Sequence, residues 1–276
     1  MTTAGITVRF WGVRGSIPVS GASTCGAGGD TSCVEIRCGD HEFLFDAGSG
    51  IRKAGETLAK EGLRTCDLFL SHSHYDHIIG LPFFSPLLSP ELNFSLWSAK
   101  LDGGLSSEET AASLMRAPFF PVTPHVFKAS MAYRDFIPGD TLQPRSGISI
   151  RTARLAHPGG VVAYRIEYKG RTAVYMTDTS HGERSSDSAA QSLADGADLL
   201  IYDCMYTDDE FAGHGGYGHS TWQQGVRICQ SAGVPRLALF HHAPDRSDDG
   251  LARIEGEARA VLPQAFAARQ GMTISI

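Results

Sequence analysis

A short stretch of the sequence, DLFLSHSHYDHIIG, carries four side chains that can bind a metal ion. They are His72, His74, Asp76 and His77, and they follow the apolar run that ends at Leu70. Ordering three imidazoles and a carboxylate side by side without a cation would be unfavourable, because their lone pairs and charge would lose water together. The cluster therefore predicts a metal centre.

Three more candidate ligands occur far along the chain, each directly after a strand-like apolar segment. His157 follows RLA, Asp178 follows VYMT and His241 follows LALF. Taken singly, each has a plain structural interpretation, either a buried histidine with satisfied hydrogen bonds or a turn residue. Side chains at the ends of rigid strands can, however, be held within the tolerance that a metal ion requires. Seven nitrogen and oxygen donors exceed the needs of one tetrahedral zinc and suit two ions bridged by a carboxylate.

The residue patterns around these side chains predict alternating strands and helices. Strands are expected in ITVRFWG, in the hairpin SCVEIRCGDHEFLFDAG, in CDLFLSHS, over 147–156, 161–168 and 171–177, in ADLLIYDC, in PRLALFHH and in MTISI. Helices are expected over 49–61, 106–116, 186–195, 221–232 and 249–262, with Ser49 and either Asp248 or Asp249 as caps. Strands grouped in two halves with helices between them indicate an α/β fold of two packed sheets with helices outside. We expect one domain over 1–276, with an inserted segment around 82–130 that is rich in proline and aromatic residues and holds one helix.

The composition is that of a soluble globular protein with a formal charge of −6. This charge argues against a general binder of nucleic-acid backbone, so we expect no extended nucleic-acid surface. The N-terminus lacks a secretion signal and no apolar run reaches the length that crosses a membrane, so a cytoplasmic protein without a membrane partner is expected. The six cysteines form no CxxC pair, which favours reduced thiols; a small metal site among Cys25, Cys33 and Cys38 stays open.

Several motifs together resemble the metallo-β-lactamase superfamily, and within it the phosphodiesterase branch. They are SHSHYDH, RLAHPGG, MTDT, GHSTW and LFHH, and the likeness runs from GVRGSIP to LFHHAPDRSDD. That branch includes ribonuclease Z, cyclic-nucleotide phosphodiesterases and phosphoribosyl cyclic phosphate phosphodiesterase. The resemblance implies a four-layer αββα sandwich with two metal ions at one edge. It also implies a homodimer, because dimers are common among the relatives.

Carried over position by position, the resemblance implies a ligand set. One ion would be bound by His72, His74 and His157. The other would be bound by Asp76, His77 and His241, with Asp178 bridging the two ions. Zinc is the first choice, and manganese or iron would also suit these ligands. Asp46 in FLFDAG matches an aspartate that usually supports the ligands, with a simple turn residue as the alternative.

Sequence differences from these relatives argue against some of their reactions. Class B1 β-lactamases have a cysteine in the second metal site, whereas the bridge position here is Asp178, so antibiotic hydrolysis is not expected. Ribonuclease Z commonly carries an RNA-gripping arm between the ligands that match His157 and Asp178, but these residues are only 178 − 157 = 21 positions apart and one hairpin fills the interval. The Phe-Ser-x-Arg-Tyr run that can follow the last ligand is absent. The loop expected to read Gly-Gly-Asn-Thr-Ser has Asp30 in place of asparagine, which leaves amide donation there open.

The GHSTW stretch predicts an anion site at the start of a helix. Ser220 and Gln223 form an S-x-x-Q pattern typical of a capping box, and Trp222 begins an apolar helical face. His219 would then precede the helix N-terminus, where free amides and the helix dipole favour an anion. In the phosphodiesterase branch the matching histidine lies beside the substrate phosphate. The alternative is a histidine that only packs against the helix start.

These observations predict a dinuclear-metal hydrolase that cleaves a small cyclic phosphodiester to a phosphomonoester by metal-bound hydroxide, with a cyclic nucleotide as first choice. Asp76 would orient the nucleophile or accept its proton, and His219 would donate to the leaving oxygen. Ser220, Phe119 and Phe120 are candidate substrate contacts, with core packing as the alternative for the two phenylalanines.

Other interpretations stay open. His242 could support the site or be structural, and Arg14 in GVRGSIP could approach phosphate or belong to a turn. An RNA-processing nuclease of the ribonuclease Z type would need a basic strip or arm that the sequence does not show. A hydrolase of a thioester or another non-phosphate ester would use the same metals. A non-enzymatic binding protein is contradicted by the complete ligand set.

Overall fold

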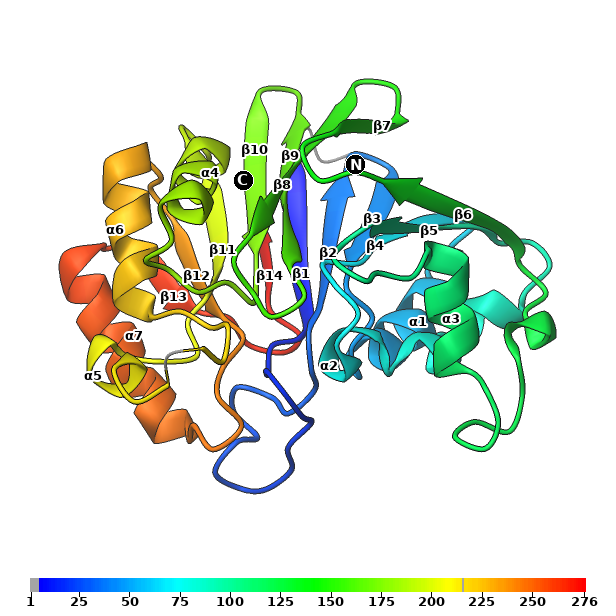
Figure 1. Cartoon of the computed structure of the whole chain (residues 1–276), viewed down its shortest axis with the longest axis horizontal. Helices are drawn as coiled ribbons and strands as arrows, with labels where there is room; N and C mark the ends of the chain where they lie inside the picture. Colours follow the sequence, from blue (N-terminus) through cyan, green and yellow to red (C-terminus); the bar gives the residue numbers. More distant parts are fainter. Residues whose placement is uncertain (1–4, 215) are drawn as a thin grey trace.

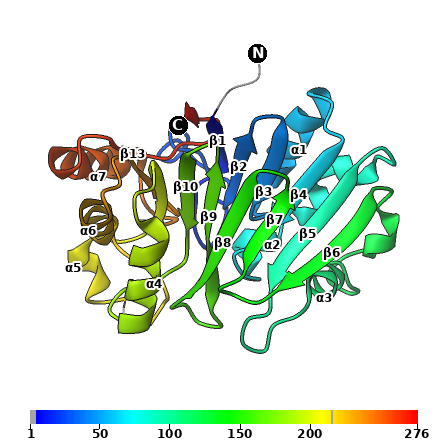
Figure 2. The same ribbon diagram turned by 90° about the horizontal axis from the view of Figure 1, so that it is seen from above.

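Two seven-stranded sheets pack face to face, with helices on both outer sides (Figures 1 and 2). The computed structural model describes residues 5–214 and 216–276. Side chains from both inner faces, including Phe10, Phe45, Phe69, Tyr164 and Tyr175, form the central core. Ring centroids in this core lie 5.3–5.7 Å apart where Phe45 meets Phe69, Tyr164 and Tyr175. The predicted α/β sandwich is confirmed.

The first sheet contains the strands that lead to the HxHxDH cluster. Across the sheet the order is β14 (Thr273–Ser275), β1 (Ile6–Gly12), β2 (Cys33–Cys38), β3 (His41–Phe45), β4 (Thr65–Phe69), β5 (Asn93–Ala99) and β6 (Ser130–Phe136). From β3 to β6 neighbouring strands run parallel. The expected hairpin turns at Gly39, whose φ of 62° suits glycine. The expected C-terminal strand pairs with β1.

The second sheet contains the strands that lead to the other candidate ligands. Its order is β13 (Ala265–Ala267), β12 (Leu237–Phe240), β11 (Leu199–Asp203), β10 (Arg171–Met176), β9 (Val161–Tyr168), β8 (Ile148–Leu155) and β7 (Thr141–Arg145). The strands β10, β11 and β12 are parallel, and β9 is antiparallel to both β8 and β10. Therefore β8, β10, β11 and β12 all end at the same edge of the sheet.

Helices cover the outer faces of both sheets. The longer ones are α1 (Ile51–Lys60), α3 (Ser107–Leu114), α4 (Arg184–Ala194), α6 (Trp222–Ala232) and α7 (Asp248–Val261), and the short ones are α2 (Tyr75–Ile78) and α5 (Asp208–Phe211). Figure 2 shows α1 and α3 outside the first sheet and α4, α6 and α7 outside the second. None of the described helices is long and apolar enough to cross a bilayer.

The helix starts differ from the predicted caps at three places. The cap of α6 is Thr221, one residue after the predicted Ser220, and its hydroxyl accepts from the amide of Gln224. The cap of α7 is Ser247 rather than an aspartate, and α1 has no side-chain cap. The adjacent Asp248 instead accepts hydrogen bonds from two loop amides. Neighbouring polar residues compete for a cap, and tertiary contacts decide between them.

The segment 82–130 contains more structure than the one predicted helix. Helix α3 begins with the expected capping box of Ser106 and Glu109. The segment also holds β5, which lies inside the first sheet between β4 and β6. Three short 3-10 turns, at 81–83, 85–88 and 124–126, account for much of its proline. The prolines of these turns hid the strand signal, in which Phe94 and Leu96 alternate on the buried face.

Candidate metal centre

The candidate ligands converge because several strands end at the same edge of the sandwich. His157 follows β8, Asp178 follows β10 and His241 follows β12, and these three strands run in one direction. The loop after β4 brings the HxHxDH cluster to the same edge from the first sheet. Three groups of metal-capable side chains form there: one of three histidines, one of four residues, and a third of Asp203, His219 and His241 that shares His241 with the second.

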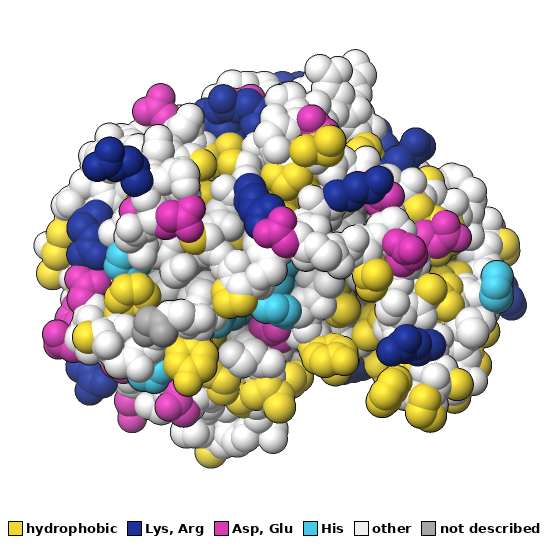
Figure 3. All heavy atoms as spheres, in the orientation of Figure 1, with side chains coloured by type: hydrophobic (Ala, Val, Ile, Leu, Met, Phe, Trp, Pro, Cys, Tyr) yellow, Lys and Arg dark blue, Asp and Glu magenta, His cyan; other side chains and the backbone are white. Residues whose placement is uncertain are grey.

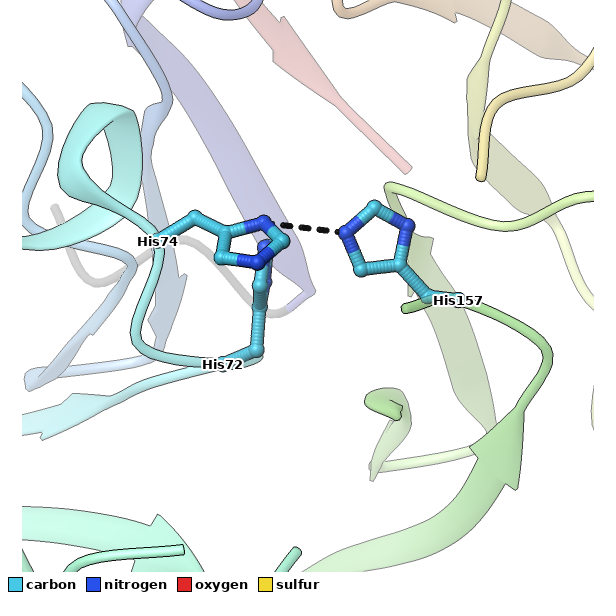
Figure 4. A group of neighbouring side chains, drawn as sticks. All are labelled: His72, His74 and His157. Atoms are coloured by element: carbon cyan, nitrogen blue, oxygen red, sulfur yellow. Dashed lines mark hydrogen bonds between the residues drawn. The ribbon is translucent and has the colours of Figure 1, made fainter. Parts of the chain in front are cut away.

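The first group consists of His72, His74 and His157 (Figure 4). Nε2 of His157 lies 3.0 Å from Nδ1 of His74. His157 donates from Nδ1 to the carbonyl of Gly218 at 2.8 Å, so in the neutral ring Nε2 keeps a lone pair that can bind a metal ion. Burial lowers the pKa of all three histidines, most strongly that of His72. Neutral imidazoles that face one another in this way are suited to a cation.

The second group consists of Asp76, His77, Asp178 and His241, all of them buried. Nε2 of His77 lies 3.0 Å from Asp178 Oδ2 and 3.3 Å from Nε2 of His241. Nε2 of His241 lies 3.1 Å from the same Asp178 oxygen and 3.3 Å from Asp76 Oδ2. Burial lowers the pKa of His77, but the carboxylates around it outweigh burial and raise that pKa well above its usual value. The carboxylates of Asp76 and Asp178 thus give this group a negative charge that a bound cation would neutralise.

Asp178 faces both groups with different oxygens. Its Oδ2 belongs to the second group, while its Oδ1 lies 3.9 Å from Nε2 of His72 and 4.0 Å from Nε2 of His157. Nε2 of His72 is buried and has no hydrogen-bond partner among the described residues. An orphaned buried nitrogen on one side and a carboxylate shared between two donor sets fit two divalent ions bridged by Asp178.

The chain turns sharply at three of the strand ends. Asp46, Asp178 and His241 have φ values of 62°, 49° and 59°, in the left-handed region that non-glycine residues seldom occupy. Such conformations cost about 1–2 kcal/mol each relative to ordinary backbone and persist where surrounding packing imposes them. Two of the three are candidate ligands, so the strained backbone directs metal-capable side chains into the site.

Asp46 orients a ligand, in agreement with its predicted supporting position. It accepts hydrogen bonds from the amide and hydroxyl of Ser71, from the hydroxyl of Tyr175 and from Nδ1 of His77, all at 2.7–2.8 Å. The last bond fixes the proton of His77 on Nδ1, so Nε2 faces the second group. Since the Ser71 hydroxyl donates to Asp46, it can accept from Nδ1 of His72 at 3.0 Å, which frees Nε2 of His72 as well.

His219 lies beside the ligands and is held by a carboxylate that the sequence analysis missed. Its Nδ1 donates to Asp203 Oδ2 at 3.0 Å, and its ring stacks on that of His241 with centroids 5.0 Å apart. Burial lowers the pKa of His219, but Asp203 outweighs it and raises the pKa to about 9. Asp203 is the last residue of β11, so the rule that singled out the other strand-end residues applies to it as well.

Comparison with known proteins identifies the superfamily and the fold. The sequence profile of the family described as beta-lactamase superfamily domain matches residues 41–242. The chain belongs to the metallo-β-lactamase superfamily. It is 25% identical to ribonuclease Z of Thermoplasma volcanium and 27% identical to that of Halobacterium salinarum, over 98% of this chain and 97% of each relative. Members of the superfamily such as these relatives are hydrolases, and this chain is a hydrolase of the same superfamily, in its ribonuclease Z and phosphodiesterase branch.

Solved structures share the fold over almost the whole chain. The metallo-β-lactamase fold protein YhfI from Bacillus subtilis has a TM-score of 0.76 at 22% identity, covering 99% of this chain and all of that one. A diphosphatase from the PhnP family has a TM-score of 0.71 at 18% identity, covering 100% and 98% of the two chains. Human tRNase Z, short form, has a TM-score of 0.70 at 20% identity, covering 98% and 99%.

Ser220 is not placed where it could contact a substrate. It is fully buried, and its hydroxyl lies 2.9 Å from the hydroxyl of Tyr202 and 2.8 Å from Nδ1 of His181. Because the helix cap is the next residue, Ser220 points back into the protein instead of toward the helix start. The prediction of a substrate contact is therefore corrected to a structural one.

His242 and Arg14 also hold the fold together. His242 donates from Nε2 to the carbonyl of Ala268, and burial lowers its pKa to about 3, so it is neutral. Arg14 is fully buried and donates from Nε and Nη1 to the carbonyls of Gly28, Ala243 and Arg246, while its Nη2 has no hydrogen-bond partner among the described residues. These contacts favour the structural alternative for both residues.

The loop that contains Arg14 nevertheless touches the metal centre through its backbone. The amide of Ser16 donates to Asp76 Oδ2 at 2.8 Å. A Cβ at Gly15 would lie 2.5 Å from the ring of His241, so only glycine fits there. Nearby, Asp30 accepts from the hydroxyl of Ser49 with Oδ1 and from the side-chain amide of Gln270 with Oδ2. Both contacts need an acceptor, which suits a carboxylate at the position where asparagine was expected.

Phe119 and Phe120 are not core residues. Phe119 is 78% exposed, and Phe120 packs edge-on against the half-exposed Phe83 with ring centroids 5.9 Å apart. The core-packing alternative is therefore wrong for Phe119. The cysteines are all unpaired, and the metal-capable groups among the described residues contain only histidine and aspartate, so the option of a cysteine site gains no support.

Proposed function

We propose that this hydrolase is a dinuclear-metal phosphodiesterase that cleaves a small cyclic phosphodiester, with a cyclic nucleotide as the first candidate and zinc as the first candidate metal. The observation that carries the proposal is the position of His219 beside the carboxylate between the two donor groups: its Nδ1 donates to Asp203 Oδ2 at 3.0 Å and lies 3.8 Å from Asp178 Oδ1. A histidine held by a carboxylate next to two bound metal ions would suit an anionic substrate with an anionic leaving group.

Each residue of the site has a role in this reaction. Bound divalent ions would lower the pKa of a water molecule and neutralise the phosphoryl oxygens. Asp76 is placed to accept the proton of the attacking water through Oδ1, since its contacts to His77, His241 and Ser16 use Oδ2. Because Asp203 holds Nδ1 of His219, the proton on Nε2 is the one available to the leaving oxygen.

The short chain segment between His157 and Asp178 favours a compact substrate. From His157 to Asp178 the chain forms only β9, β10 and a turn at Lys169 and Gly170, both with positive φ. No arm that could grip a folded RNA arises in this interval. The formal charge of −6 also makes an extended RNA surface unfavourable.

Ribonuclease Z activity is the second candidate. It is favoured by the curated relatives of that name, which match this chain over nearly their whole length. Hydrolysis of a thioester or another non-phosphate ester on the same metals is a further alternative, in which the loss of His219 would matter little.

A homodimer is part of the proposal. Several large apolar side chains near α2 and the 116–126 segment are exposed, including Tyr75, Ile79, Phe83 and Phe119. Burying such side chains against a second copy would remove apolar surface from water. Light scattering on the wild type and on a Phe119→Ser, Phe83→Ser variant tests this, and a wild-type monomer would contradict it.

A substrate panel tests the proposed activity. The protein is loaded with zinc or manganese and assayed with 3′,5′- and 2′,3′-cyclic nucleotides, a linear aryl phosphodiester, a thioester and a precursor transfer RNA. We expect turnover of a cyclic nucleotide and its loss after chelation. Cleavage of the precursor RNA alone would establish the second candidate, and cleavage of the thioester alone would overturn both.

A further inference from the structure

Two cavities flank the loop of residues 158–160, and both touch ligands of the metal centre. The larger cavity, about 560 Å³, is lined by His157 and Gly218 together with Arg154 and Glu183. The smaller, about 200 Å³, is lined by His72 and His74 and by the loop 101–105. Pro158 lines both cavities. Together they offer room for a substrate larger than the scissile phosphate, such as a nucleotide.

An ion pair lies between the two cavities. Arg154 Nη1 donates to Asp102 Oδ1 at 3.0 Å, and Nη2 donates to Oδ2 of the same residue. Arg154 lines the larger cavity and Asp102 the smaller. The guanidinium also lies against Gly160, where an added Cβ would be 3.1 Å from Nη2. Among the described residues that line the two cavities, Arg154 is the only lysine or arginine.

The carboxylate of Asp102, which accepts the hydrogen bonds of the Arg154 guanidinium, is weakly held. The side chain of Asp102 is 74% exposed and that of Arg154 45% exposed, and exposed ion pairs contribute little to stability. Figure 3 shows the histidine side chains near the middle of this face, with basic and acidic side chains beside them. A guanidinium that donates two parallel hydrogen bonds is matched in shape to phosphate, which carries more charge than a carboxylate.

We propose that Arg154 binds a second phosphate group of the substrate in place of Asp102, and so selects phosphodiesters that carry an additional phosphate. This inference rests on the proposed phosphodiesterase function and adds the substrate class. Arg154 acts in specificity and not in bond cleavage. The scissile group is held at the metal centre, while the second phosphate lies at the boundary between the two cavities.

Two matched substrates test the proposal. Thymidine 5′-(p-nitrophenyl phosphate) and its 3′-phosphorylated form share one leaving group and differ by one phosphate. We expect the wild type to prefer the 3′-phosphorylated form in kcat/KM, and Arg154→Gln to lose about 10- to 100-fold on that form alone, as for hydrogen bonds to a charged group. Asp102→Asn should keep the preference. Arg151→Gln, which removes a comparably exposed arginine from the same strand, should behave as the wild type.

A binding measurement separates this inference from the proposed activity. Calorimetry compares thymidine 3′,5′-bisphosphate with thymidine 5′-monophosphate on the metal-loaded wild type and on Arg154→Gln. Tighter binding of the bisphosphate that disappears in Arg154→Gln supports the inference even if neither diester is hydrolysed. Equal binding of the bisphosphate by both proteins overturns it. An equal loss of kcat/KM on both diesters in Arg154→Gln also overturns it, because Arg154 would then only hold the loop 101–105.

Discussion

Asp203 Oδ2 lies 3.0 Å from Nδ1 of His219, and this pair joins the end of β11 to the loop before α6. The other oxygen of Asp203 accepts from the amide of Met205, so the carboxylate itself is fixed. The pair sets both the charge and the orientation of His219. In the proposed reaction this contact would leave Nε2 of His219 as the position of the acidic proton.

Removal of either member of this pair should lower turnover without removing metal. We expect His219→Ala to lower kcat by about 10²- to 10⁴-fold, the usual contribution of a general acid. Asp203→Asn should lower kcat less, shift the pH profile of kcat and leave KM nearly unchanged. Steady-state kinetics and metal analysis by mass spectrometry measure these effects. His125→Ala, at an exposed histidine in a short turn, is the control, and an equal loss there would contradict the assignment.

The proposed bridge at Asp178 predicts that variants of different ligand candidates lose different numbers of metal ions. Asp178→Ala should lower the occupancy of both ions, because its oxygens face both donor groups. His72→Ala should lower the occupancy of one ion only. Metal counts per chain distinguish the two variants. Chelation should also lower Tm, since ions that bind only the folded chain stabilise it. Two ions retained in Asp178→Ala would refute the bridge.

The four hydrogen bonds to Asp46 predict an effect on metal affinity. Asp46→Asn introduces an amide donor among four donors, so His77 should lose its fixed orientation. We expect metal affinity to fall by about 10- to 100-fold, as for other partners of metal ligands. Tyr175→Phe removes one bond and leaves His77 in place, at a cost of about 0.5–1.5 kcal/mol in stability. Competition with a chelating dye measures the affinity, and a similar affinity in both variants would contradict the role of Asp46.

Glu42 on β3 predicts a pH dependence of stability. Burial raises its pKa from 4.5 to about 7, and one of its carboxylate oxygens has no hydrogen-bond partner among the described residues. The folded chain therefore binds this proton more tightly than the unfolded chain. The stability from this group is fully present below pH 4.5 and is lost as the pH rises through about 7.

Replacing Glu42 by glutamine should remove this dependence. The difference in the free energy of unfolding between Glu42→Gln and the wild type should grow in favour of the variant from pH 5 to pH 8. Urea denaturation at several pH values measures it. A difference that does not change with pH would show that Arg37, 2.9 Å from Glu42, keeps the carboxylate ionised in the folded chain.

Local sequence was sufficient for much of the fold and for the choice of candidate metal ligands, which the structure brings together. The cluster from His72 to His77 was recognisable without tertiary information, because ordering so many polar donors together is unfavourable without a cation. The strands before His157, Asp178 and His241 were recognisable from short apolar runs. Strands that run in the same direction within a sheet end at the same edge. The prolines around β5 obscured the local pattern there, so that strand was missed.

Only the tertiary structure decided which atoms face each other. Whether Asp178 faces both donor groups, whether Asp203 or solvent meets His219, and whether Ser220 faces inward depend on how two sheets and their helices pack. A sequence pattern places a residue at the end of a strand but does not set the direction of its side chain. That direction follows from packing and from backbone turns, such as the positive φ at Asp178 and His241, that only neighbouring elements can impose.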